Sequence, residues 1–159
     1  MRQGGFSLVE LVVVMGIAMV LIAIGTLQFN EYSRKNAIES QAKKLQADLL
    51  RTKADALLQR RDRAVTFSSS QYSIYSSSVT TVGPVQQVAV KNAISSDIAG
   101  QLVFEKSGLV TDPSMANRAI CVGPSGNRAA VDSVVITDTQ IRIGKWSAGN
   151  CEMANITLK

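Results

Sequence analysis

The hydrophobic and polar residues divide the chain into three stretches of different character. Residues 6–29 are apolar almost without a break, and Glu10 is the only charged residue among them. Residues 30–62 place apolar residues at helical spacing, and from residue 64 onward short apolar runs alternate with Ser, Thr and Gly. We therefore expect an α+β fold in which one long N-terminal helix packs on a small strand-rich C-terminal domain.

The apolar stretch 6–29 is long enough to cross a membrane. At about 1.5 Å per residue it spans roughly 36 Å as a helix, and a hydrocarbon core is about 30 Å thick. An ordinary secretory signal has an apolar region of only about 7–15 residues with a small-residue cleavage site after it. Here no Ala-x-Ala pattern closes the run, and Gly4 and Gly5 precede it. A plain membrane anchor remains the simpler alternative.

Glu10 separates the plain anchor from a more specific interpretation. A carboxylate toward the middle of a membrane helix costs about 2.5–3.5 kcal/mol, so such a residue usually has a partner. Cleavage after Gly5 would create a free amine on Phe6, and that amine on a neighbouring chain would be a cationic partner for Glu10. A plain anchor explains the length of the apolar stretch but not this acid.

Residues 30–62 are predicted to continue the helix, because they contain no Pro or Gly and are rich in good helix formers. One apolar face recurs at three- and four-residue steps and should carry the globular domain. Its members are Ile38, Ala42, Leu45, Leu49, Thr52 and Ala56. We expect this face to widen toward the C-terminal half through Leu50, Ala54, Leu57 and Leu58.

The remaining residues predict strands separated by turns. The candidate strands are 64–67, 72–75, 85–90, 101–104, 119–122, 134–136, 140–143 and 155–158. Residues 76–84 and 111–117 are predicted to be loops, and residues 123–126, Gly-Pro-Ser-Gly, to form a turn. About a hundred residues follow the helix, which suits one small domain.

Composition argues against an enzyme or a metalloprotein. The 159 residues include no histidine, which removes Ser-His and Cys-His catalytic pairs and the commonest metal ligand. The two cysteines, Cys121 and Cys151, are too few for a structural zinc cage. No base and nucleophile stand at a catalytic spacing, so we expect no enzymatic activity, no cofactor and no metal.

Cys121 and Cys151 are candidates for a disulfide. If the apolar helix spans a membrane, both cysteines lie on the translocated side, which is oxidising in many bacteria. A bond between them would stabilise the fold by roughly 3–4 kcal/mol on the chain-entropy model. Two free thiols are the alternative. Arg2, the only charge before the apolar stretch, fits a cytoplasmic N-terminus.

Residues 5–14, Gly-Phe-Ser-Leu-Val-Glu-Leu-Val-Val-Val, resemble the prepilin signature of type IV pilins and type II secretion pseudopilins. The resemblance implies that a prepilin peptidase cuts between Gly5 and Phe6, that the same enzyme methylates the Phe6 amine, and that Glu10 pairs with the N-terminus of an adjacent subunit. The chain then divides into a leader (1–5), a transmembrane assembly helix (6–29), its amphipathic continuation (30–63) and a β-rich domain (64–159). Residues 25–28 lack the helix-kinking proline that major pilins often carry.

A more diffuse resemblance extends to the GspH/FimT group of minor pilins. Residues 47–56 followed by 60–67 are similar to the group's passage from helix to first strand, and residues 102–108 to its strand-turn motif. This implies a structural subunit of a type IV pilus or a type II secretion pseudopilus, with other pilin subunits, the prepilin peptidase and the membrane as partners. It would be a single-pass protein of the bacterial inner membrane with its C-terminal domain in the periplasm, or part of the assembled filament.

Basic residues concentrate on the second half of the predicted helix. Residues 30–63 hold nine basic and five acidic residues, a net charge of +4 out of the chain's +5. The densest cluster is Arg-Arg-Asp-Arg at 60–63. It fits a solvated helix end, where cations suit the helix dipole. A contact between subunits is a second interpretation.

DNA binding is the alternative function, because some FimT-like minor pilins bind DNA during natural transformation. The resemblance implies a Gly-Arg-x-Arg motif in a C-terminal strand region, and residues 139–146 are the comparable passage. Only Arg142 matches that motif, with Lys145 nearby and Arg128 in support. Several phosphate contacts are needed for binding at physiological salt, and these residues fall short of that number. Otherwise Arg142 is an outward-facing strand residue.

Overall fold

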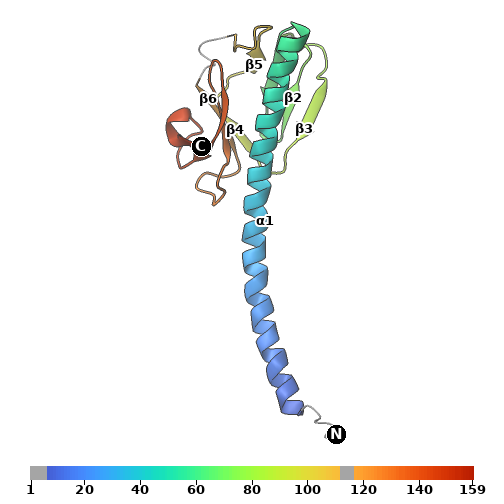
Figure 1. The fold of residues 1–159 in the computed structure, drawn as a ribbon, viewed down its shortest axis with the longest axis vertical. Coiled ribbons are helices and arrows are strands. Elements are labelled where there is room, and N and C mark those ends of the chain that lie inside the picture. Colours follow the sequence, from blue (N-terminus) through green and yellow to red (C-terminus); the bar gives the residue numbers. More distant parts are fainter. Residues whose placement is uncertain (1–6, 112–116) are drawn as a thin grey trace. The chain divides into compact units, whose positions relative to one another are not determined.

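The structure, a computed structural model, describes residues 7–111 and 117–159 (Figure 1). The predicted leader, residues 1–5, and Phe6 lie outside the described residues, and so do residues 112–116 of the predicted loop. The chain forms two compact units, residues 1–34 and residues 35–159. The predicted α+β fold is confirmed: one long helix and a strand-rich domain with two antiparallel sheets.

Helix α1 runs from Leu8 to Gln59. In the unit 35–159 its predicted apolar face is buried, with every one of its members at most 2% exposed. Those members are Ile38, Ala42, Leu45, Leu49, Thr52 and Ala56. The predicted face is therefore confirmed.

The predicted widening of this face is wrong. Leu50, Leu57 and Leu58 are 44%, 45% and 82% exposed, and Ala54 is exposed as well. At about 100° per residue these four positions turn away from the buried face. The sheets cover one side of the helix only, so leucines on the other side stay at the surface.

The helix ends three residues earlier than the sequence predicted. Arg60 has a φ of 51°, a left-handed conformation that L-residues rarely adopt. Its N–H donates to the Leu57 carbonyl at 3.4 Å, and the Arg61 N–H donates to the Ala56 carbonyl at 3.2 Å. This pattern is a Schellman motif, which stops the helix and satisfies its last carbonyls with backbone donors.

The first sheet has the strand order β3-β2-β1-β5, and neighbouring strands are antiparallel. Its strands are β1 (Arg63–Phe67), β2 (Gln71–Ile74), β3 (Gln86–Ala89) and β5 (Gln101–Phe104). The second sheet has the order β4-β6-β7-β8-β9 and is antiparallel too. Its strands are β4 (Ile94–Ser96), β6 (Arg118–Val122), β7 (Ser133–Ile136), β8 (Ile141–Trp146) and β9 (Ile156–Leu158), the last following the short 3-10 helix η2 (Met153–Asn155).

Each of the eight predicted strands corresponds to an observed one, with boundaries that differ by a few residues. Strand β4 was not predicted, and β8 continues to Trp146, beyond the predicted end at residue 143. The predicted loop 76–84 contains no strand, and Gly123 and Gly126 in the predicted turn both have positive φ. Positive φ is where glycine has an advantage over other residues.

Two apolar clusters lie on opposite faces of the second sheet. The larger one joins the buried face of α1 to both sheets and includes Ile120 and Val134. The smaller one includes Cys121 and Val135, their immediate neighbours along β6 and β7. Because successive strand residues point to opposite faces, this alternation places the C-terminal segment, residues 147–155, rather than α1, over the outer face of the sheet.

Candidate functional site

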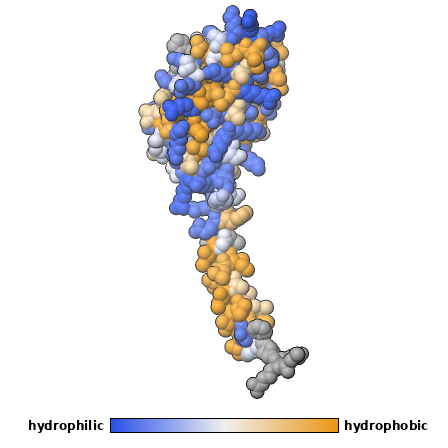
Figure 2. Space-filling view, viewed as in Figure 1, coloured by the Kyte–Doolittle hydropathy of each residue, from blue (hydrophilic) through white to orange (hydrophobic). Residues whose placement is uncertain are grey.

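The first part of α1 presents a surface that is mostly apolar. Its large apolar side chains from Leu8 to Ile24 are between 51% and 79% exposed, and Figure 2 shows them as the orange surface of the N-terminal part of α1. In the described part of the chain one helix, α1, is long and apolar enough to cross a membrane, with a mean hydropathy of 2.7 over its best window. These side chains need a lipid or protein partner to leave water.

Glu10 is the acidic residue in the first turn of α1, and it is exposed among these apolar side chains. A carboxylate in the first turn interacts favourably with the positive end of the helix dipole. Lipid around the helix would remove its hydration, and a dipole alone does not offset that cost. Glu10 is therefore a group that would gain from a cation supplied by another molecule. Phe6, whose amine on a neighbouring chain was predicted to supply that cation, lies outside the described residues, and so does Gly5.

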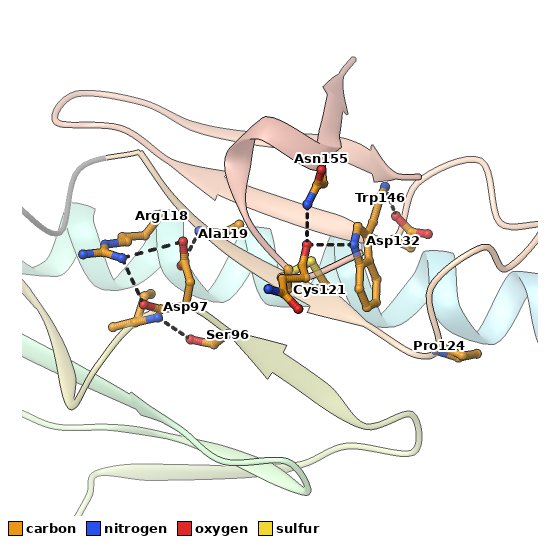
Figure 3. Close-up of a disulfide and its surroundings, with 12 residues drawn as sticks. Ser96, Asp97, Arg118, Ala119, Cys121, Pro124, Asp132, Trp146 and Asn155 are labelled. Atoms are coloured by element: carbon orange, nitrogen blue, oxygen red, sulfur yellow. Dashed lines mark hydrogen bonds and ion pairs between the residues drawn. A yellow bond between two sulfur atoms is a disulfide. The ribbon is translucent and has the colours of Figure 1, made fainter. Parts of the chain in front are cut away.

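The domain contains a disulfide between Cys121 and Cys151 (Figure 3), as one of the two alternatives predicted. Cys121 lies on β6 and is fully buried, whereas Cys151 lies in the segment between β8 and η2. The Cα atoms are 5.9 Å apart and the residues are separated by 30 positions in the sequence. The bond thus fastens the C-terminal segment to the middle of the second sheet.

Hydrogen bonds hold the same segment over the disulfide. The Trp146 indole N–H and the Asn155 side-chain amide both donate to the Asn150 carbonyl, at 3.2 and 3.0 Å (Figure 3). The indole itself packs in the smaller apolar cluster. These contacts account for Trp146 as a core residue of the segment.

Asp97 is a partly buried carboxylate beside this segment. It accepts a hydrogen bond from the Ala119 backbone N–H at 2.7 Å and lies 3.9 Å from Arg118 (Figure 3). Burial raises the pKa of Asp97 above its ordinary value, and the nearby charge of Glu152 adds to the rise. The Ala119 hydrogen bond and Arg118 lower the pKa in part but do not cancel the effect of burial.

A second buried carboxylate, Asp132, was not singled out in the sequence. Its side chain is fully buried and accepts hydrogen bonds from the Trp146 backbone N–H at 2.6 Å and the Asn127 amide at 2.8 Å. The Lys145 ammonium is 2.5 Å from it. A single acid inside the apolar stretch 129–136 was the signal that could have revealed this network.

The structure does not bring the predicted DNA contacts together. Arg142 and Lys145 are three positions apart on β8, so they point to opposite faces of the sheet. Arg142 is exposed, whereas Lys145 is paired with Asp132 and also donates to the Asn127 carbonyl at 2.6 Å. Arg128 is exposed in the segment between β6 and β7. The Lys145 side chain therefore makes contacts within the domain, as the cationic partner of Asp132.

The described residues contain no group of three or more His, Cys, Asp or Glu side chains that could hold a metal ion. The features that stand out in the structure are an apolar helix with one acid and a domain fastened by a disulfide.

The comparisons with known proteins match a short N-terminal motif in the sequence and the fold in the structure. Residues 1–26 match the family described as the prokaryotic N-terminal methylation motif. A search of curated proteins finds no match. Among solved structures, the chain is similar to the minor pseudopilin EpsH from the Type 2 Secretion System of Vibrio cholerae, with 18% identity and a TM-score of 0.53, covering 66% of this chain and 94% of that one.

The chain is also similar to the type IV minor pilin FimU of Pseudomonas aeruginosa. The identity is 16% and the TM-score 0.54, over 75% of this chain and 96% of that one. At such low identity these structures show the shared fold, and the motif is an independent match in the sequence. The chain therefore carries a prokaryotic N-terminal methylation motif at residues 1–26 and shares its fold with a minor pseudopilin and a type IV minor pilin.

Proposed function

We propose that the chain is a minor pilin or pseudopilin subunit that joins or primes a filament of a type IV pilus or a type II secretion system. A prepilin peptidase cleaves it between Gly5 and Phe6 and methylates the new Phe6 amine. The subunit is held in the bacterial inner membrane by α1 with its domain in the periplasm, and it enters the filament when Glu10 pairs with the N-terminus of a neighbour.

The observation that carries this proposal is the position of the motif. The match to the methylation motif covers the start of the exposed apolar helix, and the only charge in that apolar stretch is Glu10. The helix continues into the core of a domain with the fold of a minor pilin. Membrane attachment and assembly therefore use one end of α1, and the other end carries the domain.

Processing is tested by expressing the full chain with and without a prepilin peptidase and measuring the intact mass. We expect the enzyme to remove residues 1–5 and to add one methyl group to Phe6. Gly5→Leu is the matched variant, because a bulky residue before the cut should block cleavage while leaving the apolar helix unchanged. An unprocessed wild-type chain beside an active peptidase would overturn the proposal.

The role of Glu10 is tested separately with Glu10→Gln in the native host. This change removes the charge but keeps the shape, so membrane insertion and cleavage should continue. Incorporation into filaments should fall at least about tenfold, since the pairing offsets a burial cost of about 2.5–3.5 kcal/mol. Ser7→Ala is the control. If Glu10→Gln entered filaments as well as the wild type, charge pairing would not drive assembly.

A further inference from the structure

A basic depression lies where α1 ends. It has a volume of about 410 Å³ and is lined by residues from three separate segments of the chain. Its lining residues are Arg60, Arg61, Asp62, Ser76, Ser77, Ser78 and Lys106. We call it the basic depression. Among these residues, only Arg60, Arg61 and Asp62 were singled out in the sequence. The others lie in the loop after β2 and in the turn after β5.

The cations of the basic depression have no acidic partner within the described part of the chain. The side chains of Arg60, Arg61 and Lys106 form no ion pair there, and all three residues are exposed. The carboxylate that lines the depression, Asp62, accepts a hydrogen bond from the Lys106 backbone N–H at 3.0 Å, which fixes the turn that carries Lys106. The lining of the depression therefore carries three cations and one carboxylate.

Helix capping does not explain these cations. The last turn of α1 contains no basic residue, and the Schellman motif already satisfies the Ala56 and Leu57 carbonyls with the backbone N–H groups of Arg61 and Arg60. The two guanidinium groups are not needed for that purpose. Lys106 belongs to a different segment, and a helix end does not account for its presence either.

The serines supply neutral hydrogen-bond donors beside the cations. The hydroxyl of Ser77 donates to the Val79 carbonyl at 3.1 Å, which shapes the loop. The hydroxyls of Ser76 and Ser78 make no hydrogen bond to any other described residue. Planar guanidinium forks, an ammonium and free hydroxyls are the donor set that suits the oxygens of a phosphate group.

We propose that the basic depression binds a phosphate-bearing small anion. Three cations around one hollow match the charge of one or two adjacent phosphate groups. A nucleic-acid strand would need a longer row of contacts along its backbone to bind at physiological salt. The proposal goes beyond assembly, since it concerns the domain at the end of α1 that is remote in sequence from Glu10.

The test is an isothermal titration of the full chain in an uncharged maltoside detergent with inorganic pyrophosphate. We expect saturable binding at one site. Arg61→Ala and Lys106→Ala should each weaken it about tenfold, because each removes a charge-assisted contact. Ser76→Ala combined with Ser78→Ala should weaken it about threefold without changing the net charge. Circular dichroism confirms that each variant is folded.

The matched control is Arg51→Ala, which removes an exposed arginine of α1 that does not line the depression. Its affinity for pyrophosphate should stay within twofold of the wild type. An equal loss in Arg51→Ala and Arg61→Ala would mean that only general surface charge attracts the anion, and the proposal would be rejected. Binding of duplex DNA without binding of pyrophosphate would also reject it, in favour of nucleic acid. Neither outcome bears on cleavage at Gly5 or on Glu10, so the assembly proposal stands or falls separately.

Discussion

Asp132 and Lys145 form an ion pair of which only one partner reaches solvent. The Asp132 side chain is fully buried, while that of Lys145 is 24% exposed. Taking a carboxylate out of water is costly unless a cation and other donors replace the lost hydration. Lys145, the Trp146 N–H and the Asn127 amide together make that replacement. The lysine that was a candidate DNA contact in the sequence is thus the cationic partner of a buried acid.

We predict that Lys145→Met lowers the free energy of unfolding by about 3 kcal/mol. The change keeps most of the side-chain volume but leaves Asp132 buried without its cation, and breaking one half of such a pair costs about 3–5 kcal/mol. Thermal unfolding of the full chain in detergent measures the loss. Arg142→Met, at an exposed position of the same strand, should change stability by less than about 0.5 kcal/mol. Equal effects of the two substitutions would contradict the structural role of Lys145.

Asp97 makes stability depend on pH in a direction that follows from its raised pKa. The folded state holds the proton of Asp97 more tightly than the unfolded state, whose pKa is near the ordinary 3.8. As the pH rises from 3.8 through the higher folded pKa, the buried carboxyl must ionise at a cost, so the unfolding free energy that it contributes falls. Below 3.8 both states are protonated and the contribution is fully present.

Asp97→Asn should remove this dependence, because the amide oxygen can still accept the Ala119 N–H and carries no charge. We expect the melting temperature of the wild type to fall relative to Asp97→Asn as the pH rises through that interval. The comparison cancels the titration of the other acids, which both proteins share. A difference in melting temperature that stayed constant between pH 3 and 7 would show that burial does not govern this carboxyl.

At the scale of elements, hydrophobic periodicity in the sequence predicted the buried face of the helix. It did not predict features that depend on which other elements pack against the helix. The buried face of α1 was predicted correctly from Ile38 to Ala56, because six residues at helical spacing can share only one face of a helix. The proposed widening failed because periodicity shows that Leu50 and Leu58 are apolar, not whether a sheet covers them. The helix end was missed because Arg60 adopts a conformation that favours glycine, so its identity gave no stop signal.

Strands were predicted where apolar residues are frequent. Strand β4, Ile-Ser-Ser, has a single apolar residue and depends on its pairing with β6, which sequence alone does not reveal. For β8, the predicted strand ended before Gly144, because glycine in the interior of a strand weakens it. The structure gives a reason for the glycine: a Cβ at that position would lie 2.4 Å from a methyl carbon of Ile156 and 2.9 Å from the Thr157 carbonyl on β9.

We predict that Gly144→Ala weakens the pairing of β8 with β9 and lowers the unfolding free energy by about 1–3 kcal/mol, the usual cost of overpacking. The Ile156 side chain can shift, but the Thr157 carbonyl belongs to the ladder and cannot shift without lengthening its hydrogen bonds. Denaturant unfolding gives the value. Gly126→Ala is a useful comparison because no atom lies within 4 Å of its Cβ position, so its cost comes from the positive φ alone. If Gly144→Ala were no more costly than a change without steric conflict, the close approach would be unimportant.

At the scale of the whole molecule, the N-terminal motif could be recognised in the sequence, whereas the residue clusters of the domain could not. The predicted leader, Glu10 and the apolar run are contiguous, so the sequence alone was enough to predict a role for them. The basic depression combines residues 60–62 with 76–78 and 106, and the Asp132 network joins 127, 132 and 145–146. These sets form only when strands pair, and no spacing in the sequence indicates them. The disulfide is an intermediate case. The sequence contains a single pair of cysteines, but it does not show how far apart they lie in the fold.

That disulfide divides the domain into parts that depend on it to different degrees. The larger apolar cluster joins α1 to both sheets and contains neither cysteine. The smaller cluster contains both cysteines, and it is the one that holds the C-terminal segment on the outer face. We predict that replacing Cys121 and Cys151 with Ala exposes residues 147–155 to fast amide hydrogen exchange, while protection in residues 35–59 of α1 and in β1 persists.

The physical reason is that the bond closes a loop over 30 positions, which is worth roughly 3–4 kcal/mol, and that it fastens this segment to β6. Hydrogen exchange followed by mass spectrometry of the full chain in detergent gives the protection peptide by peptide. The wild type after reduction and alkylation should show the same local pattern, which separates loss of the bond from the effect of the alanines. Uniform loss of protection across α1 and both sheets would mean that the domain unfolds as one unit. In that case the segment after β8 would be part of the core rather than a cover held by one covalent bond.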